Sequence, residues 1–200
     1  MRSRISTALA LIALSVLGTG TVLAQGFQLP PLLVESNAFP DGGIVPAKFS
    51  FRGGNTQPDF RISNAPAGTV AYAVIFHDID VALAGGTDDV LHWLAWNIPA
   101  TGATTQIAEG KLPDGSVVGK NITGQNSFMG SGAPPGPRYH HYVFEFYALN
   151  AKLDLPDTAG RPELLEALKG KVVAKAAYVG RFKGEAPPPG AAPAGPPPAR

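Results

Sequence analysis

The chain has 200 residues, no cysteine, and 16 Lys+Arg against 15 Asp+Glu, a formal net charge of +1. This length suits one domain with a sizeable core, and the near-neutral charge gives no argument for nucleic acid or anionic membranes as partners. The absence of cysteine excludes disulfides, thiolate metal sites and thiol nucleophiles.

The chain begins with the pattern of an export signal. Two arginines within the first four residues precede the apolar run Ala8–Leu17, which is short for a membrane-spanning helix, and small residues lead up to Ala24. We therefore expect residues 1–24 to be a signal peptide cleaved after Ala24. The mature protein would be periplasmic or secreted, without a transmembrane segment. An uncleaved membrane anchor is the alternative.

Short apolar runs separated by turn-forming residues follow from Phe27 to Phe182. This texture predicts β-strands. The expected strands are Lys48–Arg52, Ala71–His77, His92–Ile98, Tyr142–Leu149 and Lys171–Arg181. Two runs within them, Ala71–Phe76 and Leu91–Ile98, are nearly all apolar, which indicates strands buried on both faces.

One helix is expected near the C-terminus. Pro162 lies near its start, Glu163–Lys169 supplies helix formers, and Gly170 can end it, with three leucines on one side: Leu164, Leu165 and Leu168. Many strands and one late helix predict a mainly β fold, an antiparallel β-sandwich with a small C-terminal helical addition, over residues 25–184. Residues 185–200 are almost all Pro, Ala and Gly and are expected to form a disordered tail, with a spacer or a proline-rich ligand as alternatives.

All four histidines lie in two short segments. The first contains His77-Asp78-Ile79-Asp80 and then His92-Trp93, and the second contains Gly130-Ser131-Gly132 and then His140-His141-Tyr142. Ser131 lies between glycines, but the segment is not a nucleophile elbow and no base is paired with it, so we expect no catalytic chemistry. The phosphate-loop and dinucleotide-binding patterns fail as well.

A metal site is one interpretation of the aspartates and histidines. Alternate residues of a strand point to one side, so Asp78 and Asp80 would converge, and with His92 and His140 they would resemble a zinc or calcium cluster. The spacing is not diagnostic, however, and Asp-x-Asp at a strand end is more often a turn device. We expect neither a metal nor a cofactor.

An anion pocket fits the same residues better. The imidazoles of His92 and His140 and the hydroxyl of Tyr142 can donate hydrogen bonds to phosphate oxygens, and glycines at 130 and 132 let backbone N–H groups approach a ligand. One aspartate can orient a histidine, and the other can meet the ammonium group of a zwitterion. His77 and His141 each neighbour a candidate residue, so strand alternation would point them away from the pocket.

Several motifs in order resemble the phosphatidylethanolamine-binding protein family, in its bacterial Raf-kinase-inhibitor-like branch. They span about residues 44–149. They are a Gly-x-Asn-x-x-Pro segment ending at Pro58, a Pro-x-Gly-Thr turn at Pro66–Thr69, Asp78-x-Asp80, His92-Trp93, Trp96-Asn97-Ile98-Pro99, the Gly130–Pro135 loop and His140-x-Tyr142-x-Phe144.

The resemblance implies a Greek-key β-sandwich that binds phosphate-type anions and phospholipid head groups. Its ligand residues would be Asp78, Asp80, His92, Gly130, Gly132, His140 and Tyr142. The chain departs from the family pattern at Ile79 and Ala82-Leu83, where prolines are usual, and at Ile62, Phe128 and His141. We therefore expect a non-enzymatic binding protein for a small phosphate-bearing ligand or a phospholipid head group. A kinase- or protease-inhibitor-like interaction module, with an unknown protein partner, is the alternative.

Overall fold

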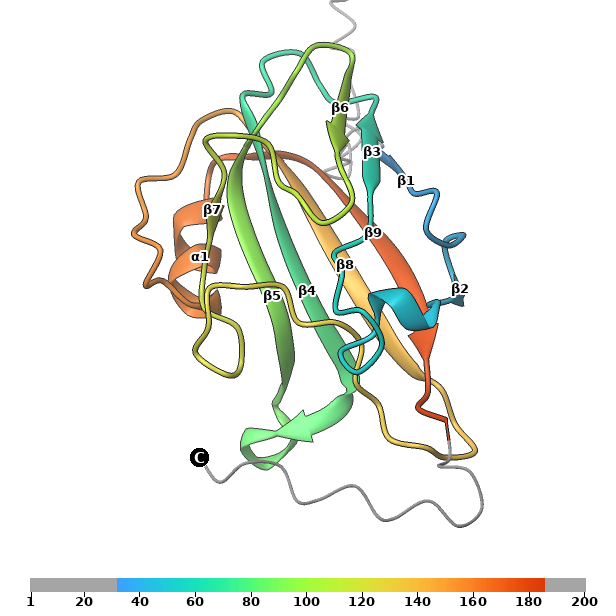
Figure 1. Cartoon of the computed structure of the whole chain (residues 1–200). Helices are drawn as coiled ribbons and strands as arrows, with labels where there is room; N and C mark the ends of the chain where they lie inside the picture. Colours follow the sequence, from blue (N-terminus) through green and yellow to red (C-terminus); the bar gives the residue numbers. More distant parts are fainter. Residues whose placement is uncertain (1–31, 186–200) are drawn as a thin grey trace, which may run out of the picture.

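The structure, a computed structural model, describes residues 32–185, so the predicted signal peptide and almost all of the predicted tail lie outside the described residues. The described chain forms nine strands, one α-helix and two short 3₁₀ helices (Figure 1). In chain order they are β1 (Leu33–Glu35), β2 (Gly43–Ile44), η1 (Ala47–Phe49), β3 (Phe60–Ser63), β4 (Ala71–Leu83), η2 (Ala84–Gly86), β5 (Asp88–Pro99), β6 (Thr104–Ile107), β7 (Val117–Val118), β8 (His140–Leu149), α1 (Arg161–Leu168) and β9 (Val172–Phe182).

The strands form two sheets, of order β1-β3-β6 and β2-β9-β8-β4-β5-β7. Pairings between these strands are antiparallel except for the short contact of β2 with β9. Within the large sheet, the order β8-β4-β5-β7 is that of a Greek key, because β8 returns along the chain to pair with β4. The prediction of a mainly β, antiparallel Greek-key sandwich is confirmed.

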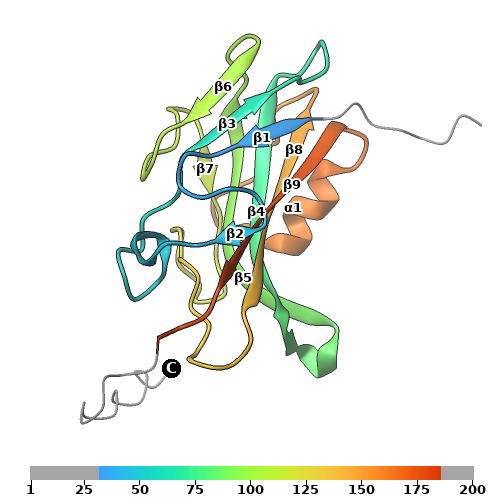
Figure 2. The ribbon, with the colours of Figure 1, turned by 90° about the vertical axis from the view of Figure 1, so that its right-hand side faces the viewer.

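The large sheet is covered on both faces, by the small sheet on one side and by α1 on the other (Figure 2). Strand β4 shows how the sequence meets this demand. Tyr72, Val74 and Phe76 pack into the core between the sheets, whereas Ala73 and Ile75 pack under α1. The nearly continuous apolar run is therefore needed, because successive side chains point to opposite buried faces.

Helix α1 lies close to its predicted position. Pro162 occupies its first turn, and the carboxylate of Glu163 accepts a hydrogen bond from the backbone N–H of Gly160 at 3.0 Å. The prediction of one apolar side is corrected at Leu165, which is exposed, whereas Leu164 and Leu168 are buried. The reason is that residues four apart share a helix face and adjacent residues do not. Within residues 32–185, no helix is long and apolar enough to cross a membrane.

The predicted strand Lys48–Arg52 is wrong. The segment forms the 3₁₀ helix η1 followed by a turn. The Ser50 hydroxyl donates to the carbonyl of Ala47 at 2.8 Å and accepts from the N–H of Gly53 at 3.1 Å, so local bonds replace strand pairing here. Five short strands were not predicted, namely β1, β2, β3, β6 and β7.

Candidate functional site

Most of the predicted site residues gather at one end of the large sheet, where β8 begins and the β4–β5 hairpin leaves the sandwich (Figure 1). Asp78 lies on β4 directly opposite Tyr142 of β8. His140 precedes Tyr142 by two residues and therefore faces the same side of the sheet. The loop at Gly130–Gly132 meets this end through bonds to Tyr142.

His92 enters the site because β5 carries a β-bulge. Phe76 of β4 is opposite Trp93, but the next residue, His77, is opposite Leu91, so His92 is an extra residue in the ladder. Trp93 packs into the core between the sheets and Leu91 under α1. The bulge lets His92 point to the same side as Trp93, where its ring contacts Phe76 at 5.2 Å between centroids.

Asp78 and His140 form a partly buried pair. Oδ2 of Asp78 lies 2.9 Å from Nδ1 of His140, and Oδ1 accepts the backbone N–H of Asp80 at 3.0 Å. The Asp78 residue is only 3% exposed. A carboxylate held so far from water needs such hydrogen-bond partners.

Tyr142 is fully buried and holds the glycine loop. Its hydroxyl accepts hydrogen bonds from the backbone N–H groups of Gly132 at 3.1 Å and of Ala133 at 2.8 Å. Burial raises the pKa of Tyr142 well above its usual range, and the facing carboxylate of Asp78 raises it further. The hydroxyl is therefore never ionised at physiological pH, and it ties Asp78 to the loop.

The donor atoms predicted for the glycine loop need a correction. The N–H of Gly130 donates to Oδ1 of Asn55 at 2.8 Å, and the N–H of Gly132 donates to Tyr142. These groups are occupied within the protein because the loop packs directly on the turn that contains Asn55. Gly130 and Gly132 remain predicted ligand neighbours, but not through these N–H groups.

Asn55 holds the glycine loop, a role that its place in the Gly-x-Asn motif does not reveal. Its backbone adopts a left-handed conformation with φ 49°, which asparagine tolerates better than most residues. A Cβ at Gly130 would meet the carbonyl oxygen of Phe49 at 2.3 Å, so only glycine fits this contact. The Gly-x-Asn motif was the signal in the sequence. In the structure this motif joins the turn that contains Asn55 to the glycine loop at Gly130.

His92 is almost fully buried, with 3% of the residue exposed. Its Nδ1 lies 2.9 Å from the carbonyl oxygen of Met129, and its ring meets that of Tyr142 edge to face at 5.3 Å. Burial lowers the pKa of His92, and this effect outweighs the carbonyls of Met129 and Gly130 and the charge of Asp78, which act in the opposite direction. His92 is therefore neutral at neutral pH, with its proton on Nδ1.

The carboxylates of Asp78 and Asp80 have separate partners, and within residues 32–185 they form no metal cluster. Oδ2 of Asp80 accepts from the backbone N–H of His141 at 2.6 Å and lies 2.8 Å from Nδ1 of the same residue, while Arg138 lies 3.2 Å from Oδ1. Burial alone would raise the pKa of Asp80, but the bonds from His141 hold it below its usual range. Strand pairing of β4 with β8 ends at Asp78, which frees Asp80 to turn toward His141.

His77 faces away from the site, as predicted. Its Nδ1 lies 2.6 Å from Oδ2 of Asp89, and its Nε2 lies 3.8 Å from Glu145, on the α1 side of the sheet.

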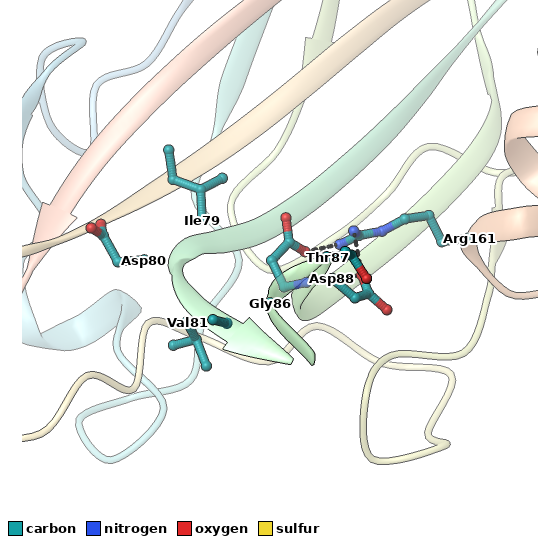
Figure 3. A pocket seen from close by; sticks show the side chains of 9 residues that line it. Ile79, Asp80, Val81, Gly86, Thr87, Asp88 and Arg161 are labelled. Atoms are coloured by element: carbon teal, nitrogen blue, oxygen red, sulfur yellow. Dashed lines mark hydrogen bonds and ion pairs between the residues drawn. The ribbon is translucent and has the colours of Figure 1, made fainter. Parts of the chain in front are cut away.

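A cavity of about 290 Å³ lies beside Asp89, and its lining includes Asp80, Asp88 and Arg161 (Figure 3). Across residues 32–185, no group of three or more His, Asp or Glu side chains is placed to hold a metal ion.

Acid is expected to destabilise the protein through His92. The folded-state pKa of His92 lies below its unfolded value of about 6.5, so its contribution to stability is complete above that pH and is lost as the pH falls through the folded pKa. Urea unfolding from about pH 7 to pH 5 should show a falling free energy of unfolding, with a shallower slope in His92→Gln. An identical slope in that variant would show that another group causes the loss.

Comparisons with known proteins place the chain in a family. A family model described as phosphatidylethanolamine-binding protein matches residues 35–183. The chain is 33% identical over 153 residues to a UPF0098 protein of Methanothermobacter thermautotrophicus, covering 75% of this chain and 97% of the other. It is 34% identical over 155 residues to a candidate lipoprotein, LppC, of Mycobacterium tuberculosis, covering 77% and 73%. The crystal structure of Escherichia coli YbcL, described as a new member of the mammalian PEBP family, has a TM-score of 0.69 with this chain at 29% sequence identity. The match covers 77% of this chain and 99% of YbcL.

Proposed function

Because the chain belongs to the phosphatidylethanolamine-binding protein family, we propose that it is an exported, non-enzymatic binding protein for phosphate esters or phosphoethanolamine-type head groups. The observation that carries this proposal is the cluster of Asp78, His92 and His140 at one end of the sheet. Burying an ionisable group costs stability unless partners compensate for the lost water, and groups with perturbed pKa values concentrate at functional sites. Here a histidine paired with a carboxylate lies beside a neutral, buried histidine.

Charge supports a zwitterionic ligand. His140 is the group suited to the phosphate, because Asp78 engages only its Nδ1, at 2.9 Å, and its Nε2 can meet a ligand. Asp80 stays ionised because the bonds from His141 lower its pKa, and its carboxylate suits an ammonium group. We assign the phosphate to His140 and His92 and the ammonium to Asp80.

Binding without catalysis is favoured because the polar side chains of the site bond to other parts of the protein. Tyr142 holds the loop and His140 holds Asp78. Ser131, the serine of the glycine loop, is only 1% exposed, and its carbonyl pairs with the N–H of Phe51. A nucleophile must reach its substrate, and this hydroxyl lies inside the loop packing.

Export is supported by the signal-like pattern of residues 1–24 and by the relative LppC, whose name describes a lipoprotein. We propose a periplasmic or secreted location, with cleavage after Ala24. Release of a mature chain that begins at Gln25, read by mass spectrometry of the exported protein, is the expected result.

A protein-docking role has one observation in its favour. Phe51 and Ile79 are each 52% exposed, and they adjoin the glycine loop and Asp78 respectively. Apolar side chains exposed next to the proposed site can contribute to a surface that meets a partner. A partner that is retained by a His140→Ala variant would separate docking from ligand capture.

The binding proposal is tested by titrating the purified protein with phosphoethanolamine and following the histidine ring resonances. We expect the signals of His92 and His140 to move at millimolar ligand while that of His77 stays fixed. His140→Ala should weaken binding by about 10- to 100-fold, since a hydrogen bond to a charged group contributes about 1.5–3 kcal/mol. His77→Ala is the matched control, because the ring of His77 pairs with Asp89 and Glu145 on the α1 side of the sheet. Unmoved signals for both site histidines would disprove the proposal.

A further inference from the structure

The chain contains the tripeptide Pro-Asp-Gly twice, at residues 40–42 and 113–115, and both copies form a β-turn. In each copy the carbonyl of the proline accepts a hydrogen bond from the backbone N–H three residues later, at 2.8 Å and 3.2 Å respectively. The glycine has a positive φ in both turns, 71° and 88°, and the aspartate is exposed in both. Sequence, turn and exposure are therefore matched, and the two copies differ in their contacts with the rest of the protein.

The first copy is tied to strand β9. The N–H of Gly42 donates to the carbonyl of Val179 at 2.8 Å, and Oδ1 of Asp41 accepts from the N–H of Val179 at 2.7 Å. The Nε–H of Arg181 also donates to the carbonyl of Gly42 at 2.8 Å. These bonds hold the carboxylate of Asp41 and the N–H that follows it on separate partners, so the two groups are kept from reacting with each other.

The second copy has no such ties. Within residues 32–185, neither the carboxylate of Asp114 nor the N–H of Gly115 has a hydrogen-bond or ion-pair partner. The side chain of Ser116 also bonds within the turn, where its hydroxyl donates to the carbonyl of Pro113 at 2.7 Å and leaves the Asp114–Gly115 peptide group unbonded. The side chain of Asp114 and this peptide group can therefore rotate toward each other.

We propose that Asp114–Gly115 is a modification site at which aspartate converts spontaneously to isoaspartate, with water as the only co-reactant. The backbone nitrogen of Gly115, unhindered because glycine has no Cβ, attacks Cγ of Asp114. A C–N bond forms, and the amide proton leaves with the carboxyl hydroxyl as water, which gives a cyclic succinimide. Water then adds to one of the two ring carbonyl carbons and breaks its bond to nitrogen. Addition at Cγ restores aspartate, and addition at the main-chain carbon yields isoaspartate.

The modification would act on one edge of the large sheet. An isoaspartate carries the main chain through Cβ and Cγ, which inserts one extra backbone carbon shortly before β7. Strand β7 begins at Val117 and pairs with β5 through Ala95 and Trp96. Because this pairing is so short, we expect the modified protein to keep its central strands and to loosen at β7.

The test incubates the purified, folded protein in neutral buffer made with ¹⁸O-labelled water. Each opening of a succinimide places a labelled oxygen at the aspartate, whichever product forms. After tryptic digestion in ordinary water, mass spectrometry reads the label in the peptides that end at Lys48 and Lys120, each of which contains a single aspartate, and fragment ions locate it. We expect label to accumulate at Asp114 at least about tenfold faster than at Asp41, because two hydrogen bonds to Val179 must break before Asp41 can react.

The same protein unfolded in urea separates structure from sequence. There the bonds to β9 are absent, so the two Pro-Asp-Gly copies should take up label at similar rates. Asp114→Glu is the control for the chemistry, because its longer side chain cannot close the five-membered ring, and label at position 114 should fall to background. Equal rates at Asp41 and Asp114 in the folded protein overturn the proposal, and so does label at Asp114 that appears only in urea. No ligand takes part, so the result is independent of the proposed function.

Discussion

Replacing Gly130 by alanine is expected to destabilise the protein by about 3 kcal/mol and to abolish ligand binding. A Cβ at this position would lie 2.3 Å from the carbonyl oxygen of Phe49 and 2.7 Å from the backbone nitrogen of Phe51. These are backbone atoms, so relief requires the loop to move, and overpacking of this kind typically costs about 1–3 kcal/mol. The shift also breaks the bond from Gly130 to Asn55. Urea denaturation and phosphoethanolamine titration measure the two effects.

Two glycines of the same loop provide the controls. A Cβ at Gly136 meets nothing within 4 Å, and at Gly132 it meets the side chain of Phe51 at an ordinary 3.8 Å. Neither position has the positive φ that would strain alanine. Gly136→Ala and Gly132→Ala should therefore stay within about 0.5 kcal/mol of the parent. A loss in Gly132→Ala equal to that in Gly130→Ala would refute the assignment of the close contact to Gly130.

Tyr142→Phe is expected to cost about 2–4 kcal/mol of stability. The missing hydroxyl leaves the buried N–H of Ala133 without its acceptor, which costs about 1–3 kcal/mol, and removes the bond from the exposed residue Gly132, which adds about 0.5–1.5 kcal/mol. The ring itself stays, so the packing against Phe76 and His92 is unchanged. Equilibrium unfolding in urea gives the difference directly.

Tyr147→Phe is the matched control, since Tyr147 lies on the same strand and loses one bond, to Glu145, at the edge of the α1 face. We expect a loss of about 1 kcal/mol there. Equal losses in the two variants would mean that the hydroxyl of Tyr142 does not hold the glycine loop.

The sandwich was predictable because its long central strands satisfy two buried faces at once. The apolar runs at Ala71–Phe76 and Leu91–Ile98 permit little else. The short edge strands escaped prediction because two to four residues carry too little periodicity to distinguish pairing from a turn. The segment Lys48–Arg52 shows the reverse error. Its alternating apolar residues suggested a strand, but local hydrogen bonds of the Ser50 hydroxyl hold the segment in a turn.

In the site, the sequence indicated which residues gather but not how they pair. Asp78 and His140 were expected together, and they lie 2.9 Å apart. Asp80 was expected beside them, but its carboxylate meets His141. The reason is that the pairing of β4 with β8 ends at Asp78, before it reaches Asp80. The point at which strand pairing stops, and the contacts between loops, depend on residues far apart in the chain. A local sequence pattern carries no information about them.

The bulge in β5 separates what this strand needs for folding from what it offers a ligand. Leu91 packs under α1 and Trp93 packs into the core between the sheets, so the two neighbours of His92 alternate as in a regular strand. His92 is the extra residue of the bulge and has no partner of its own in the ladder. Because His92 is the residue without a partner in the ladder, a variant that lacks it can keep Leu91 and Trp93 on their own faces. The proposed ligand group can therefore change while the frame of the sandwich stays intact.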